Sequence, residues 1–211
     1  SQITDVLPFI EALEKALDLI DDLKAENIYL SHIDIGGGIG VEYNNEKTID
    51  IENYIQSVIN MVGDLKIIIE PGRSIVGDAG IFVTKVEHLK QNDSKSFAII
   101  DGAMNDLIRP ALYGSYHNVV KVRDNNDGVN ASWDIVGPVC ETADFLAKDR
   151  RLNLKEGDYI AIMTAGAYGF VLSSNYNSRP RVAEVMVSGD NHGVIRKRET
   201  IELLFDNELI F

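Results

Sequence analysis

The feature that most constrains the fold of this chain is a change in its apolar pattern near residue 80. Before that point, two stretches with apolar residues at helical spacing, 9–23 and 51–62, alternate with short apolar runs at 29–35 and 66–69. Helix, strand, helix, strand in this order predicts a parallel sheet. A complete eight-stranded α/β barrel needs about 250 residues, so we expect residues 1–79 to form only part of one.

From residue 80 onward the chain is rich in β-forming residues. Glycine, asparagine and aspartate clusters separate six runs, at 81–89, 97–100, 119–122, 132–136, 159–163 and 182–187. Several short strands with turn signals and little helix predict an antiparallel β-sandwich or barrel. The expected fold class is therefore α/β plus all-β, with a first domain at 1–79, a second at 80–211 and the change near residues 78–82.

Charge and cysteine content narrow the functional class. The 33 acidic and 20 basic residues give a formal net charge of -13, which repels nucleic acid and anionic membranes, so we expect neither as a partner. No apolar run approaches the roughly 18 residues needed to span a bilayer. A single cysteine, Cys140, excludes an internal disulfide, and we expect a cytoplasmic protein. The histidines show no metal-ligand spacing, so no metal site is expected.

Two motifs follow the two strands of the first region. The glycine loop at 36–40 can bring backbone amides close to a phosphate, helped by the N-terminus of the next helix, although a plain tight turn explains it equally well. Glu70 and Arg73 follow the second strand, at the rim where α/β barrels hold their active sites. A carboxylate buried there needs a cationic or hydrogen-bonding partner. A structural ion pair between Glu70 and Arg73 is the alternative.

A third motif interrupts the β-rich region after the run at 97–100. Arg109 and Tyr113 bracket a turn around Pro110. A guanidinium binds a carboxylate through two hydrogen bonds, and a phenol adds a further donor. Without other support, the same pattern describes an ordinary surface loop.

Two more motifs lie further along the chain. Residues 137–144 place the thiol of Cys140 beside the carboxylate of Glu141, although a lone cysteine is more often a small buried apolar residue. Residues 165–169 are small except for Tyr168, which is left exposed near a possible helix start. This tyrosine either donates to a phosphate or packs.

Taken together and in this order, the five motifs resemble the fold-type III pyridoxal-phosphate decarboxylases, the alanine-racemase-like family that includes ornithine, arginine and diaminopimelate decarboxylases. The resemblance covers essentially all 211 residues. It implies that residues 1–79 are the C-terminal portion of a barrel that binds pyridoxal 5'-phosphate. The Schiff-base lysine of the family lies in the first half of that barrel, and no lysine here replaces it. We therefore expect a fragment that is inactive alone.

The resemblance also implies a role for each motif residue. Glu70 pairs with the pyridine nitrogen, and Cys140 lies near the atom that is reprotonated, so both are expected to be catalytic. The cofactor is implied to contact Ser1, Gly37, Gly38, Glu70, Arg73 and Tyr168. The substrate is implied to contact Arg73, Arg109, Tyr113, Glu141 and Tyr168. In this family Cys140 and Glu141 reach the active site of the neighbouring subunit, so a homodimer with a shared site is implied.

The motifs also bear on the choice of substrate. Ornithine ends in an ammonium group, whereas diaminopimelate ends in a second amino-acid head whose carboxylate needs an extra cation. Arg109 beside Tyr113, and Cys140 followed by Glu141, resemble the diaminopimelate branch, which converts meso-2,6-diaminopimelate to L-lysine in the last step of lysine biosynthesis. The alternatives are a decarboxylase of ornithine, arginine or another polyamine precursor, and a catalytically inactive regulatory homologue.

Overall fold

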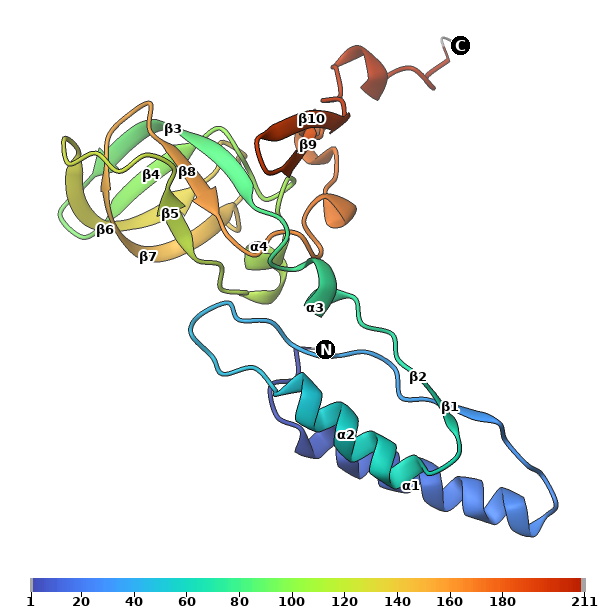
Figure 1. Ribbon diagram of the computed structural model, residues 1–211. Coiled ribbons are helices and arrows are strands. Elements are labelled where there is room, and N and C mark those ends of the chain that lie inside the picture. The colour runs from blue at the N-terminus through green and yellow to red at the C-terminus, as the bar shows by residue number, and fades with distance from the viewer. Residues whose placement is uncertain (1, 210–211) are drawn as a thin grey trace. The chain divides into compact units, whose positions relative to one another are not determined.

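The computed structural model describes residues 2–209 and divides into two compact units (Figure 1). The first unit ends at Ala79 and the second begins at Gly80, where the apolar pattern of the sequence changes. No helix within residues 2–209 is long and apolar enough to cross a membrane.

The first unit contains two long helices and a two-stranded sheet. Helices α1 (Leu7–Ala25) and α2 (Ile51–Val62) alternate with strands β1 (His32–Asp34) and β2 (Lys66–Ile68), and the short helix α3 (Arg73–Val76) follows. The strands pair in parallel, as the order of elements predicted. The apolar faces of both helices and the sheet share one core, formed by Phe9, Leu13, Ile20, Ile33, Ile39, Ile49, Tyr54, Val58 and Val62.

The second unit is built on a six-stranded sheet with the strand order β5-β8-β3-β4-β6-β7. Contacts between the edge strands β5 and β7 nearly close it (Figure 1). The strands are β3 (Phe82–Gln91), β4 (Ser96–Ile100), β5 (Val119–Lys121), β6 (Val129–Val136), β7 (Phe145–Leu154) and β8 (Tyr159–Ile162).

The expectation of a purely antiparallel sheet was wrong, because β4 and β6 pair in parallel. The chain between them runs through the short helix α4 (Arg109–Tyr113) and β5, so β6 re-enters beside β4 in the same direction. Parallel neighbours require such a crossover, whereas a tight hairpin can only join antiparallel strands. The sheet is therefore mixed.

Two of the strands were not predicted from the sequence. Strand β7 contains a run of charged residues at 148–151, which is typical of a loop, yet it pairs with β6 along its length. Strand β10 (Asn191–Arg196) pairs with β9 (Glu184–Ser188) in a separate antiparallel hairpin. In the core of the second unit, Trp133 on β6 is fully buried, and its indole Nε1 donates to the carbonyl of Leu152 at 3.0 Å.

Candidate functional site

The ends of β1 and β2 bring the first two motifs together. The amide of Ile35 donates to the carbonyl of Ile68 at 3.0 Å, and the amide of Glu70 donates to the carbonyl of Gly36 at 2.8 Å. A Cβ atom at Gly37 would lie 2.2 Å from the carbonyl oxygen of Glu70, so only glycine permits this approach. The glycine loop and Glu70 therefore share one edge of the parallel sheet.

The glycine loop keeps adjacent backbone donors available. The amide of Gly36 donates to the carboxylate of Asp34 at 2.8 Å. Across residues 2–209 we find no hydrogen-bond acceptor for the amides of Gly37 and Gly38. Gly38 has φ +99°, a conformation that L side chains rarely adopt. Consecutive amides in such a loop form a site for an anion such as a phosphate.

The helix N-terminus that was expected to support the glycine loop does not follow the loop directly. The next helix, α2, begins only at Ile51, after an extended segment, and its first turn is capped by Asp50. The carboxylate of Asp50 accepts the amide of Asn53 at 3.1 Å. Within the glycine loop, the donors are therefore the backbone amides of Gly37 and Gly38. Ser1, the other predicted phosphate ligand in this unit, lies outside the described residues.

Glu70 and Arg73 differ in how firmly they are held. Glu70 is exposed in this chain, so the sequence argument from its burial does not apply here. Arg73 opens α3 and is half-buried, and its Nη1 donates to the phenol oxygen of Tyr43 at 3.0 Å. The guanidinium carbon lies 5.7 Å from the centroid of the Tyr43 ring. Tyr43, which no sequence pattern singled out, thus orients Arg73.

Arg109 and Tyr113 lie at opposite ends of α4, where the sequence had suggested a turn around Pro110. Arg109 is only 6% exposed, and its Nη1 lies 2.8 Å from Nε2 of His117. The other ring nitrogen of His117 lies 2.9 Å from the carbonyl oxygen of Met163. Tyr113 is 66% exposed. The helix therefore buries the cation and leaves the phenol at the surface.

Tyr168 lies in the loop that follows β8. It adopts the left-handed conformation, with φ 62°, as does Thr164 with φ 55°. Its side chain is exposed, as the sequence predicted, and the 3-10 helix η1 (Phe170–Leu172) begins just after it. The phenol thus lies on a tightly turned loop that follows β8, the strand between β5 and β3.

Cys140 and Glu141 are both exposed on the loop between β6 and β7, so the alternative of a buried structural cysteine does not hold. Asp144 holds this loop. It is 3% exposed and accepts the amides of Val139 at 2.8 Å and Met104 at 2.7 Å. Burial raises the pKa of Asp144, although these two hydrogen bonds oppose the rise. One carboxylate thus ties the Cys140 loop to the loop after β4.

Sequence reasoning also missed two residues in the segment after η1. The phenol of Tyr176 donates to Glu141 at 3.2 Å. Arg179 donates from Nε to the side-chain oxygen of Asn105 at 2.9 Å and from Nη2 to the carbonyl of Asp101 at 2.7 Å. Both lie among serines and asparagines that are typical of a surface loop, and no spacing in the sequence links them to their partners.

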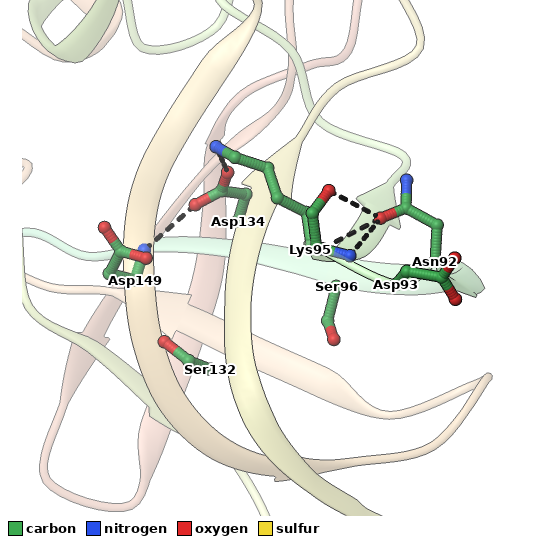
Figure 2. A pocket seen from close by; sticks show the side chains of 8 residues that line it. Asn92, Asp93, Lys95, Ser96, Ser132, Asp134 and Asp149 are labelled. Atoms are coloured by element: carbon green, nitrogen blue, oxygen red, sulfur yellow. Dashed lines mark hydrogen bonds and ion pairs between the residues drawn. The ribbon is translucent and has the colours of Figure 1, made fainter.

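A cavity of about 360 Å³ lies at the turn between β3 and β4 (Figure 2). It is lined by Asn92, Asp93, Ser94, Lys95, Ser96, Ser132, Asp134 and Asp149. Asp134 accepts the ammonium of Lys95 at 2.9 Å and the backbone amide of Asp149 at 3.0 Å. None of the site residues predicted from the sequence lines this cavity. We do not assign the reaction to it.

The family to which the chain belongs follows from comparison with known proteins. Residues 16–166 match the family model described as the C-terminal sheet domain of pyridoxal-dependent decarboxylases. The chain belongs to this family, whose cofactor is pyridoxal phosphate.

Comparison with curated proteins gives a narrower group of relatives within this family. The chain is 53% identical to the diaminopimelate decarboxylase of Pseudomonas fluorescens and 50% identical to that of Vibrio cholerae, over 99% and 100% of this chain but 50% and 51% of those proteins. The chain thus spans about half the length of these relatives. A crystal structure of diaminopimelate decarboxylase from Helicobacter pylori, complexed with L-lysine, superposes with a TM-score of 0.91 at 44% identity, covering 98% of this chain and 52% of that one.

Proposed function

We propose that this chain is part of a diaminopimelate decarboxylase, which removes one carboxyl group of meso-2,6-diaminopimelate as carbon dioxide and yields L-lysine. The observation that carries the proposal is the meeting of the glycine loop and Glu70 at one edge of the parallel sheet. The identity to curated diaminopimelate decarboxylases supports the choice of substrate. Because the chain spans half of those relatives, we assign the activity to the complete gene product, with residues 1–79 as the C-terminal portion of its α/β barrel.

The first unit and the Tyr168 loop offer the groups that the cofactor requires. Pyridoxal phosphate, when bound, supplies an acceptor for the electron pair left behind as carbon dioxide departs. The amides of Gly37 and Gly38 would bind its phosphate, with the hydroxyl groups of Ser1 and Tyr168 as further donors. The carboxylate of Glu70 would hold a proton on the pyridine nitrogen through a charge-assisted hydrogen bond.

The substrate would be held by its charged groups. Arg73, oriented by Tyr43, and Arg109 are the cations for its carboxylates, and Tyr113 adds a donor. Burial favours Arg109 for the distal carboxylate, because a charge pair is screened less away from water. Glu141 would accept the distal ammonium group.

Proton delivery and assembly form a further part of the proposal. Cys140 would supply the proton to the carbon that has lost its carboxyl group, because its thiol is exposed on a loop that Asp144 holds. We propose a homodimer in which Cys140 and Glu141 of each subunit serve the active site of the other. A cytoplasmic location suits this role, since reducing conditions keep a lone thiol available.

The proposal is tested with the complete gene product and pyridoxal phosphate. Meso-diaminopimelate and ornithine are offered in parallel, and lysine and putrescine are assayed. We expect lysine alone. Putrescine would assign the protein to the ornithine branch, and neither product from folded, cofactor-bound protein would favour an inactive regulatory homologue. For the shared site, mixing a Glu70→Ala subunit with a Cys140→Ala subunit should restore part of the activity, whereas sites within one subunit would show no restoration.

A further inference from the structure

A single buried histidine connects two of the predicted substrate and cofactor motifs. His117 is fully buried, and its Nε2 lies 2.8 Å from Nη1 of Arg109. Its Nδ1 lies 2.9 Å from the carbonyl oxygen of Met163, the residue directly after β8. Met163 opens the loop that carries Tyr168. The imidazole therefore bridges the helix that begins with Arg109 and the base of the Tyr168 loop.

The two contacts determine which ring nitrogen carries the proton. A carbonyl oxygen can only accept a hydrogen bond, so Nδ1 of His117 must donate to Met163. A guanidinium can only donate, so Nε2 must offer a lone pair to Arg109. His117 is therefore neutral, with its hydrogen on Nδ1. A proton on Nε2 would set an N–H group against the guanidinium of Arg109.

The backbone around His117 is anchored as well. Nη2 of Arg150, on β7, donates to the carbonyl of His117 at 3.3 Å, and the Arg150 guanidinium carbon lies 3.9 Å from the ring centroid of Tyr116. On the other side, the amide of Met163 donates to the carbonyl of Asn118 at 2.8 Å. These contacts fix the loop before β5 to both β7 and the end of β8, so the imidazole has a defined position.

We propose that His117 is a positioning residue for substrate recognition, which sets the guanidinium of Arg109 relative to the loop of Tyr168. This inference rests on the proposed function, in which Arg109 binds the distal carboxylate. The acceptor on Nε2 orients the guanidinium, and the donor on Nδ1 ties it to Met163. Arg109 binds a part of the substrate remote from the reacting carbon, so its displacement weakens substrate binding more than the chemical step.

Two substitutions of His117 each remove one of its two hydrogen bonds and keep the other. In His117→Gln the longer side chain carries an amide oxygen near the place of Nε2 and retains an acceptor for Arg109. In His117→Asn the shorter side chain retains a donor for Met163 and withdraws the acceptor from Arg109. His88→Asn, at a histidine whose side chain is 72% exposed, is the matched control.

The kinetic test uses the complete, cofactor-loaded protein with meso-diaminopimelate. A displaced Arg109 guanidinium loses a charge-assisted hydrogen bond to the substrate carboxylate, worth about 1.5–3 kcal/mol, so we expect His117→Asn to raise KM about 10- to 150-fold with a smaller change in kcat. His117→Gln, which loses only the hydrogen bond to Met163, should raise KM less than His117→Asn, and His88→Asn should stay close to the unsubstituted protein. An unchanged KM in His117→Asn, or equal rises in the Asn and Gln variants, overturns the inference.

A second measurement does not depend on activity or on the folding of His117→Asn. In protein labelled with ¹⁵N-histidine, the ring nitrogens of His117 should show a neutral imidazole with its hydrogen on Nδ1, assigned by the signals that disappear in His117→Gln. A charged ring, or a hydrogen on Nε2, contradicts the inference. Absence of lysine from the unsubstituted protein would instead reject the proposed function, so the two failures are distinguishable.

Discussion

Asp144 should be a main stabiliser of the loop that carries Cys140 and Glu141. Its carboxylate is 3% exposed and accepts two backbone amides, those of Val139 and Met104. Asp144→Ala leaves both donors without an acceptor, at about 1–3 kcal/mol for each buried group. The substitution also removes a carboxylate whose charged form burial disfavours, and this offsets part of the lost stability. We expect a net destabilisation of about 2–4 kcal/mol, because the two losses outweigh this offset.

The substitution Asp144→Asn should be milder. The amide oxygen keeps one acceptor, while the amide nitrogen faces the second donor, so we expect a loss of about 1–2 kcal/mol. The loss should also depend on pH. Because the pKa of Asp144 is raised in the folded protein, its carboxyl stabilises the fold below its ordinary pKa of 3.8, and this contribution disappears as the pH rises through the raised value. Asp144→Asn should therefore cost more near pH 4 than at pH 7.

Calorimetric unfolding of the complete gene product is the assay. For a unit of this size, a loss of about 2–4 kcal/mol corresponds to a fall in Tm of roughly 5–15 °C. Asp124→Asn, at an exposed aspartate, is the matched control and should change stability by less than about 0.5 kcal/mol. The reasoning is refuted if Asp144→Ala has the same Tm as Asp124→Asn, or if Asp144→Asn is less stable than Asp144→Ala.

Three further predictions concern other parts of the chain. Arg181 holds the pKa of Glu199 at about 2, so this pair stabilises the fold above the ordinary value of 4.5 and its contribution is lost as the pH falls through about 2. Glu199→Gln should cost about 1 kcal/mol or less at pH 7, because Arg181 is partly exposed. At a pH near 2 the substitution should cost nothing. Melting curves at these two pH values check this. Lys121 and Asp158 form a buried ion pair at 3.1 Å, so Lys121→Met should cost about 3–5 kcal/mol in urea unfolding, and adding Asp158→Asn should recover part of the loss. Gly37→Ala should weaken pyridoxal phosphate binding at least about tenfold in an absorbance titration, because the new Cβ meets the Glu70 carbonyl, whereas Gly193→Ala, which meets no atom within 4 Å, should not; equal affinities would contradict this role of the glycine loop.

Local sequence patterns predicted the elements that depend on local interactions. Helix α2 occupies residues 51–62 as its apolar spacing indicates, and β1 and β2 pair in parallel as the order of elements requires. Strand β7 was not predicted, because its charged centre resembles a loop. Pairing with β6 stabilises it, and pairing depends on a neighbour rather than on the composition of the strand itself.

The sequence by itself determined the family and the positions of five motifs, because each motif is a short run of neighbouring residues. It also predicted a boundary near residue 80. Only the tertiary structure placed Gly37 against Glu70, joined Arg109 to Met163 through His117, and joined the loops of Met104 and Cys140 through Asp144. These contacts join residues far apart in the chain. No periodicity or spacing encodes them, because they depend on how crossovers and strand pairing fold the backbone.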